Sequence, residues 1–279
     1  MILLRAARRQ NVKQYSLSWK QASIMNEIGI DSLSLAAYMP LTQAMVDQIA
    51  FMIQKSGTSS AGPQQVGTSA YFNQTMSTNQ YFEQNVQLMQ QNGKPIGAYF
   101  FSFAWDYASA KYEAELECDH LNALQHRPDW PVFIDWEAVS RNAVVAAGFS
   151  ITQQRMQDII QGWVDGCRGK GYLPGFYTSA AIARDDIGNT IIQNFRAQGV
   201  YFWEAHYTTA PQPWVMPCDV WQYDAGPTNT GADWMGTVVD WNKIMDDRMW
   251  QIGPGSGIPI WLKLYIANRG DKRGCTILL

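Results

Sequence analysis

The chain has 279 residues, of which 47% are hydrophobic and only 16% charged, with a formal net charge of −3. This composition supports a large buried core and excludes an intrinsically disordered chain. The slight negative charge argues against a nucleic-acid-binding protein, and no apolar run approaches the roughly 20 residues of a membrane span.

The charge is unevenly distributed along the chain. Residues 1–28 carry five basic side chains against one acidic side chain, a balance of +4, which leaves −7 for the remainder. A basic arm of this kind could contact an anionic surface such as a cell wall. We therefore expect a basic N-terminal extension over residues 1–28.

The cysteines and the N-terminus indicate no special chemistry. Cys118, Cys167, Cys218 and Cys275 are widely scattered, and no histidine lies at ligand spacing from them. The sequence therefore predicts no disulfide framework, no metal site and no cofactor. Residues 1–5 are too short for the apolar part of a signal peptide, so we expect a chain made without an export signal of its own.

Short apolar runs alternate with amphipathic stretches along most of the chain. Runs typical of β-strands lie at residues 28–30, 51–55, 95–101, 131–137, 173–177, 200–205, 219–223 and 237–240. Stretches typical of helices lie at residues 79–92, 107–124, 150–168 and 179–197. Phe82, Val86 and Met89 share one face of the first predicted helix, and Gly93 follows it where a C-terminal glycine belongs.

The alternation of strands and helices predicts an α/β fold with a parallel sheet. A length of this size suits one barrel of the (β/α) type, which routinely contains about 250 residues. Only a short loop separates the last two predicted strands, so we expect helices to be missing there. The expected single domain is an irregular barrel over residues 29–252, followed after a Gly-Pro-Gly-Ser-Gly linker by an appendage at residues 253–279.

Two carboxylates end the apolar run at residues 131–137. Asp135 and Glu137 are two positions apart, which puts both on one face of a strand while Trp136 points the other way. Two carboxylates held close together cannot both ionise freely, so one can keep a proton near neutral pH. A protonated carboxyl group beside a carboxylate is the equipment for protonating a glycosidic oxygen.

Other strand ends carry side chains suited to the same cleft. In a β/α barrel, the catalytic groups lie at the carboxyl ends of the strands. The candidates at such ends are Asp31, Lys55, Asp135, Glu137, Tyr177 and Asp240. Four acids from three separate strands would therefore face one cleft.

Several motifs occur in one order along residues 29–245. They are residues 29–31, 51–55, 93–101, 133–137, 174–178, 203–207, 221–223 with Gly226 and Gly231, and 239–242. In these motifs the chain resembles the glycoside hydrolase family 25 lysozymes, the Chalaropsis-type muramidases common among phage endolysins. The Asp-x-Glu strand, the Trp-Gln-Tyr strand and the final Val-Asp-x-Asn carry most of the resemblance.

The resemblance implies an irregular TIM-like (β/α)5(β)3 barrel and hydrolysis of the β-1,4 bond between N-acetylmuramic acid and N-acetylglucosamine. Carried over by position, Glu137 would be the general acid, assisted by Asp135, with Asp31 and Asp240 on the floor of the cleft. The residues implied to contact the glycan or frame the acids are Lys55, Tyr99, Tyr177, Tyr207 and Trp221. The implied partner is bacterial peptidoglycan, and a monomer is expected. Without a recognisable signal peptide, a wall-acting protein of this kind is expected to reach the wall by phage-type release from the cytoplasm or by a non-classical secretion route.

The chain departs from the family pattern at two places. Asp31 is followed by Ser-Leu-Ser, where family members usually continue Asp-Val-Ser, which puts the role of Asp31 in doubt. The third-strand Tyr-His-Phe of the family is Tyr-Phe-Phe at residues 99–101, so an accessory histidine is absent from the motif.

Two alternatives to a muramidase stay open. A non-catalytic module that binds wall glycan, for example within a phage tail or an adhesin, could use the same cleft without turnover. A clustered set of carboxylates favours the enzyme, because a binding module has little need for groups that repel one another. A chitinase is the other alternative, but family-18 chitinases carry a longer Asp-x-x-Asp-x-Asp-x-Glu pattern, and residues 130–137 lack its first two acids.

Overall fold

The computed structural model describes residues 28–32, 40–207, 217–224, 232–234 and 237–252, with residues 28–32, 224, 232–234 and 237–239 described by their backbone alone. Apart from Ile28, the expected N-terminal extension and C-terminal appendage lie outside the described residues. No helix in these ranges has the length and apolar character needed to cross a membrane.

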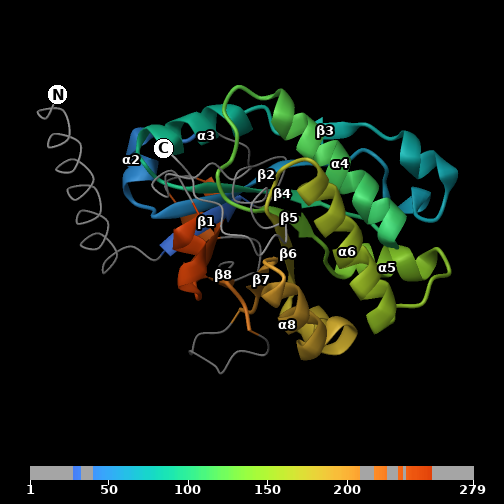
Figure 1. Cartoon of the computed structure of the whole chain (residues 1–279). Coiled ribbons are helices and arrows are strands. Elements are labelled where there is room, and N and C mark those ends of the chain that lie inside the picture. The colour runs from blue at the N-terminus through green and yellow to red at the C-terminus, as the bar shows by residue number, and fades with distance from the viewer. Residues whose placement is uncertain (1–27, 33–39, 208–216, 225–231, 235–236, 253–279) are drawn as a thin grey trace, which may run out of the picture.

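Eight strands form a ring (Figure 1). Seven of them run in one direction, parallel to one another: β1 (Ile28–Ser32), β2 (Phe51–Ser59), β4 (Ile96–Phe101), β5 (Val132–Asp135), β6 (Pro174–Ser179), β7 (Tyr201–Ala205) and β8 (Val220–Asp224). The eighth, β10 (Thr237–Ile244), is antiparallel to both β8 and β1. Because β1 also pairs with β2, the hydrogen-bonded ring closes.

Two short strands extend the sheet outside the ring. β3 (Met76–Thr78) pairs with the end of β2, and β9 (Ala232–Trp234) pairs with the start of β10. The predicted strand at residues 51–55 is therefore too short. β2 continues to Ser59 because its last residues pair with β3 instead of entering the predicted loop.

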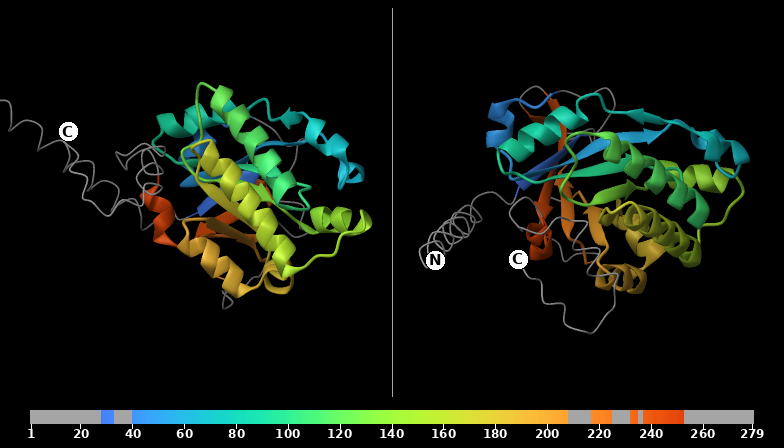
Figure 2. Two further views of the ribbon diagram at one scale, coloured as in Figure 1. Left: turned by 45° about the vertical axis from the view of Figure 1, so that its right-hand side comes forward. Right: turned by 45° about the horizontal axis from the view of Figure 1, so that its top comes forward.

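Helices cover the outside of the sheet (Figure 2). They are α2 (Gln43–Asp47), α3 (Phe82–Gln91), α4 (Tyr107–Ala123), α5 (Ala138–Ala146), α6 (Gln153–Gly169), α7 (Ala180–Ile182) and α8 (Asn189–Ala197). Shorter turns are a π-helix at Ala183–Ile187 and 3₁₀ helices at Pro63–Gln65, Ser69–Asn73 and Asp247–Gln251. Within the described part after β7, the only helix is the last of these, so the irregular α/β barrel expected from the sequence is confirmed.

The helix predictions hold best where the apolar spacing is regular. Phe82, Val86 and Met89 are buried on α3, and Gly93 has the positive φ of 65° that a terminal glycine permits. The helix predicted from residue 150 begins later, because Thr152 caps it by accepting a hydrogen bond from the Arg155 N–H. The single helix predicted at residues 179–197 is interrupted, since Gly188 with φ of 88° separates the π-helix from α8.

Apolar side chains form two cores, one inside the ring and one between the ring and the helices. β5 divides its side chains between them: Phe133 packs inside the ring, whereas Ile134 and Trp136 pack against the helices. The aromatic rings of Phe51, Trp130 and Phe133 fill the interior on the side of the strands' amino ends. The opposite half of the interior is therefore left for polar side chains.

Two glycines allow α4 and α6 to pack closely. A Cβ atom on Gly162 would lie 2.2 Å from the Tyr107 carbonyl oxygen, and one on Gly166 would lie 2.5 Å from the Ala114 Cβ. Neither position tolerates a side chain without a shift of α4. The close contact of these two helices fixes the outer layer over β4 and β5.

A network of ion pairs around one buried carboxylate connects elements from the second half of the described chain. Asp219, fully buried just before β8, accepts a hydrogen bond from the Phe202 N–H at 2.7 Å. Its carboxylate also pairs with Arg196 of α8 at 2.7 Å and with Arg248 of the last 3₁₀ helix. One carboxylate therefore joins α8, β7 and the last described helix.

Three glutamates with no role in that network are fully buried between the ring and the helices. Burial raises the pKa of Glu113 to about 7 and that of Glu117 to about 8. Hydrogen bonds from Ser102 and Tyr71 to Glu113, and from Ser56 to Glu117, oppose this increase. Burial also raises the pKa of Glu204 on β7 to about 7.

These glutamates make stability depend on pH. A free glutamate ionises near pH ~4.3, so between that pH and about 8 the unfolded chain binds fewer protons than the folded chain. The free energy of unfolding should therefore fall as pH rises through this window. We expect the melting temperature of the wild type to fall between about pH 5 and about pH 8, and the isosteric Glu117→Gln variant to lose part of that dependence. If the melting temperatures of the wild type and the variant changed equally with pH, the contribution of Glu117 to the pH dependence of stability would be contradicted.

Candidate active site

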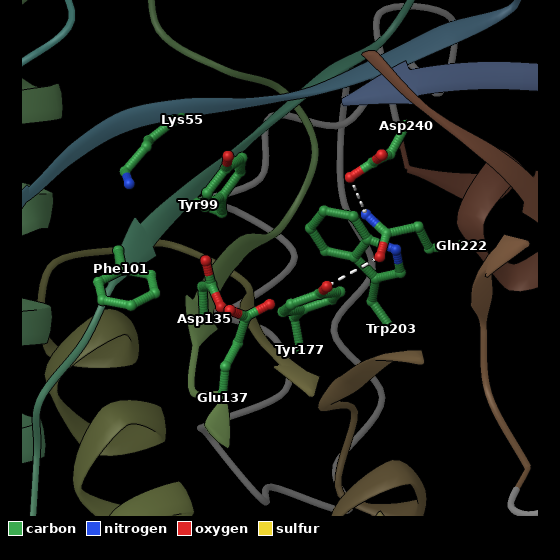
Figure 3. A pocket seen from close by; sticks show the side chains of 9 residues that line it. All are labelled: Lys55, Tyr99, Phe101, Asp135, Glu137, Tyr177, Trp203, Gln222 and Asp240. Atoms are coloured by element: carbon green, nitrogen blue, oxygen red, sulfur yellow. Dashed lines mark hydrogen bonds between the residues drawn. The ribbon is translucent and has the colours of Figure 1, made fainter. Parts of the chain in front are cut away.

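A cavity of about 150 Å³ opens at the carboxyl ends of the parallel strands (Figure 3). Seven strands of the ring, β2, β4, β5, β6, β7, β8 and β10, contribute to it, and the side chains of β1 lie outside the described part of the structure. The residues that line it are Lys55, Tyr99, Phe101, Asp135, Glu137, Tyr177, Trp203, Gln222 and Asp240. This is the end of the barrel at which β/α enzymes place their reacting groups.

Asp135 and Glu137 enter the cavity from the end of β5. The strand ends at Asp135, but Glu137 keeps an extended backbone, with φ of −121° and ψ of −172°, before α5 begins at Ala138. The alternation of a strand therefore continues for two residues, and both carboxyl groups reach the cavity. Between them, the fully buried Trp136 points outward and donates from its indole Nε1 to the Ala104 carbonyl oxygen at 2.9 Å.

The carboxyl group of Glu137 lies between Asp135 and Tyr177, with Asp240 across the cavity (Figure 3). Burial raises the pKa of Glu137 above its ordinary value, which is the direction expected for a general acid. A hydrogen bond with Tyr177 and the positive charge of Lys55 oppose this increase. The sequence reading attributed the increase to neighbouring carboxylates as well, but burial is its largest cause.

Lys55 supplies positive charge at the other side of the two acids. Its side chain is buried, and its ammonium lies 4.8 Å from the ring centre of Phe101. Burial lowers the pKa of Lys55, while the charges of Asp135 and Glu137 raise it. Lysine and carboxylates therefore bias one another's protonation within one small cavity.

Asp240 reaches the cavity from the middle of β10. It was predicted at a strand end, but β10 continues to Ile244. Because β10 runs antiparallel to its neighbours, its earlier residues lie at the edge where the parallel strands finish. The fully buried carboxylate accepts a hydrogen bond from Gln222 Nε2 at 3.0 Å.

The cavity brings together six of the residues chosen from the sequence: Glu137, Asp135, Asp240, Lys55, Tyr99 and Tyr177. Tyr207 lies at its margin, 40% exposed, and its hydroxyl donates to Gln222 Oε1 at 2.8 Å. Trp221 does not line the cavity, since its indole donates to the His206 carbonyl oxygen and its ring packs beside Tyr223. The backbone of Asp31 pairs opposite Asp240, and its side chain lies outside the described part of the structure.

Three cavity residues were not chosen from the sequence, although the motifs contained them. Phe101, Trp203 and Gln222 each lie within a segment that carried the resemblance, next to or near a residue that was chosen. Strand alternation could have found Gln222, because Trp221 and Gln222 must face opposite sides of β8. The described residues contain no group of three or more His, Cys, Asp or Glu side chains that could hold a metal ion.

Solved structures with the same fold support the barrel assignment. The autolysin LytC from Streptococcus pneumoniae, solved with a synthetic peptidoglycan ligand, aligns with a TM-score of 0.55 and 17% identity over 77% of this chain and 46% of that chain. The CTP1L endolysin aligns with a TM-score of 0.55 and 16% identity over 81% and 68% of the two chains. A bacterial lysozyme from Streptomyces coelicolor aligns with a TM-score of 0.51 and 20% identity over 82% and 97%.

The chain spans just under half the length of the LytC autolysin. Comparison with curated proteins gives no match. The sequence model of glycosyl hydrolases family 25, however, matches residues 60–232, which is more than half of the chain and includes Asp135, Glu137, Tyr177 and Gln222. The chain belongs to glycosyl hydrolases family 25.

Proposed function

We propose that this glycoside hydrolase acts on bacterial peptidoglycan as an N-acetylmuramidase that cleaves the β-1,4 bond between N-acetylmuramic acid and N-acetylglucosamine. The observation that carries the proposal is a half-buried glutamate with a raised pKa, Glu137, beside a second carboxyl group in a cavity at the catalytic end of the barrel. The peptidoglycan ligand of the LytC structure supports this class of substrate.

Glu137 is the general acid in this proposal. Its proton passes to the glycosidic oxygen as the bond to the sugar breaks, a role that requires a carboxyl group still protonated near neutral pH. Asp135, within the same cavity, orients Glu137 or steadies the acetamido group of the substrate, and Asp31 and Asp240 complete the acidic floor. Lys55, Tyr99, Tyr177 and Tyr207 contact the glycan or frame the acids.

The protein acts on the cell wall as a monomer in this proposal, without nucleic acid or cofactor. Clearing of turbid wall suspensions, with a chitin suspension as the control, tests the class of substrate. We expect walls to clear and chitin to persist. Binding to walls without clearing would instead support the glycan-binding module, and clearing of chitin alone would support a chitinase.

The pH dependence of lysis should follow Glu137. Since the acid must carry its proton, activity should be present below the pKa of Glu137 and fall as pH rises through it. Lys55 favours the ionised form of Glu137, so the Lys55→Met variant should raise that pKa and move the alkaline fall in activity to higher pH. The measurement is initial lysis rate across a pH series.

Lys111→Met provides the matched control, because Lys111 lies on the surface of α4 with its side chain 43% exposed. This variant should keep the wild-type profile. A Lys55→Met profile that moves to lower pH, or moves no more than that of the control, would contradict the electrostatic role of Lys55.

A further inference from the structure

The backbone between β4 and α4 is hydrogen-bonded to the segment that carries the proposed acid. We call residues 102–104 the β4–α4 turn. The Ser102 N–H donates to the Asp135 carbonyl oxygen at 2.9 Å. The Ala104 carbonyl oxygen accepts from the indole of Trp136, also at 2.9 Å. The β4–α4 turn therefore holds the two residues that come immediately before the acid.

Ser140 provides a third contact, on the other side of the acid. Its hydroxyl donates to the Ser102 carbonyl oxygen at 2.6 Å, and its oxygen accepts from the Glu137 N–H at 3.3 Å. The direction of both hydrogen bonds is fixed, because a backbone carbonyl can only accept and a backbone N–H can only donate. Ser140 therefore connects the backbone of Glu137 to the β4–α4 turn.

A carboxyl group on α4 holds the β4–α4 turn from the side of the helices. Glu113 accepts from the Phe103 N–H at 3.2 Å, and it is hydrogen-bonded to the hydroxyl groups of Ser102 and Tyr71. Ser102, Glu113 and Ser140 are fully buried, so water does not compete for these hydrogen bonds. None of these three residues lines the cavity.

A carboxyl group is a costly choice for this place, since burial raises the pKa of Glu113 to about 7. An apolar side chain of the same size would avoid that cost but would leave the Phe103 N–H without its acceptor. Buried polar groups of this kind favour one conformation of the chain around them. Glu113 therefore stabilises one conformation of the β4–α4 turn.

We propose that Glu113 is a positioning residue for Glu137: it fixes the β4–α4 turn, and this turn fixes the backbone of the acid through Ser140. Glu113 need not touch the substrate. The consequence for catalysis rests on the proposed function, in which a misplacement of the acid by about 1 Å lowers the rate by about 10²-fold. The positioning itself can be measured without substrate.

A displaced Glu137 would be less protected from water. Burial is the largest cause of its raised pKa, so a looser backbone that admits water should lower that pKa. The variants chosen for the test leave every other charged or titratable side chain of the cavity in place. These side chains are Lys55, Tyr99, Asp135, Tyr177 and Asp240.

The test is the pKa of Glu137, followed by the ¹³C chemical shift of its carboxyl carbon in protein labelled at glutamate. The signal is assigned by its disappearance in Glu137→Gln. Glu113→Met fills the same space without accepting a hydrogen bond from the Phe103 N–H. The pKa of Glu137 should then fall by about half a pH unit, a small part of the shift that full burial can cause. An unchanged or raised pKa would overturn the proposal.

Two further variants separate positioning from charge and from general destabilisation. Glu113→Gln removes the charge but keeps an oxygen that can accept from the Phe103 N–H, so the pKa of Glu137 should stay near its wild-type value. Glu117→Met replaces a second fully buried glutamate of α4, whose partner is Ser56 of β2, and should also leave that pKa unchanged. A decrease in either control as large as that in Glu113→Met would contradict the proposal.

Ser140→Ala tests the last step of the connection. It removes the hydroxyl that links the β4–α4 turn to the Glu137 N–H, so the pKa of Glu137 should fall in this variant as well. Adding Glu113→Met should then lower the pKa by less than it does in the wild-type background. An equal further decrease would mean that Glu113 acts by a route other than Ser140, which contradicts the proposal.

Hydrolysis of soluble wall fragments provides the second measurement. The side chains that line the cavity are unchanged, so KM should stay close to the wild-type value, while kcat should fall by roughly 10–10²-fold in Glu113→Met. Glu113→Gln should retain most of kcat. The assay is run well below the melting temperature of every variant, so that the fraction of unfolded protein does not lower kcat. A rise in KM with an unchanged kcat would contradict the positioning role.

If Glu113→Met fails to fold, Ser102→Ala replaces it in the test. This variant removes the hydroxyl contact between the β4–α4 turn and Glu113 but keeps both carboxyl groups, and it should lower the pKa of Glu137; an unchanged pKa would overturn the proposal. The titration needs no substrate. A failed titration leaves the proposed hydrolysis standing, whereas an absence of wall clearing by the wild type refutes the hydrolysis and leaves the titration valid.

Discussion

Glu137→Gln should lower the rate of wall lysis by roughly 10²–10⁴-fold, the usual contribution of general acid catalysis. Glutamine keeps the shape of the side chain but carries no proton that can be transferred to the leaving oxygen. The half-buried side chain lies beside Asp135 and Tyr177 in the cavity that Lys55 also lines. Replacement by a neutral group should therefore leave the fold intact, which thermal melting can check.

The matched control is Glu115→Gln, the same substitution on the exposed surface of α4, where the side chain is 43% exposed. This variant should lyse walls at the wild-type rate. If a well-folded Glu137→Gln protein did so too, the assignment of the acid would be wrong.

Asp219→Ala should lower the free energy of unfolding by roughly 3 kcal/mol, near the low end for breaking a buried ion pair. The carboxylate is fully buried and pairs with two arginines, so its removal leaves the two guanidinium groups with Asp246, whose side chain is 38% exposed, as their shared partner. Arg196 and Arg248 keep some contact with water, at 19% and 22% exposure, which limits the cost. Urea unfolding followed by tryptophan fluorescence measures the change.

Asp119→Ala provides the comparison for this prediction. Asp119 pairs with Lys170 at 2.7 Å, but its side chain is 61% exposed, and such surface pairs contribute at most about 1 kcal/mol. Equal decreases in the free energy of unfolding of the two variants would contradict the prediction, because Asp219 would then stabilise the fold no more than a surface ion pair does.

The strands of the barrel could be predicted because their apolar runs are short and bounded, and because amphipathic helices separate them. The closure of the ring could not be derived from these patterns. It depends on β1 pairing with both β2 and the antiparallel β10, which are contacts between the two ends of the described chain. Pairings between strands so far apart in the sequence produce no pattern within either strand from which they could be predicted.

The same limit applies to α5, which the sequence reading missed. Its apolar face is narrow, and Val139 and Val145 are exposed, so the periodicity of a buried helix is weak there. The break at Gly188 could not be predicted for a different reason. The helical pattern of residues continues on both sides of Gly188, but the helix is interrupted there because a glycine can adopt a positive φ.

At the site, Asp135 and Glu137 could be predicted to share a face because the period of two is a property of the backbone. Trp221 and Gln222 show where the prediction lost accuracy. The aromatic residue was chosen, yet the neighbouring amide is the one that lines the cavity and joins Asp240 to Tyr177. The importance of Gln222 comes from partners on two other strands, which only the folded chain brings together.

The most direct measurement of the central claim is the identity of the new reducing-end sugar after digestion of purified peptidoglycan. Reduction of the products with borohydride, followed by mass spectrometry of the released sugars, distinguishes the two glycosidic bonds of the wall. The account predicts reduced N-acetylmuramic acid as the new end, formed by the wild type and lost in Glu137→Gln. Reduced N-acetylglucosamine as the new end, or no new reducing end from a well-folded wild-type protein, would contradict it.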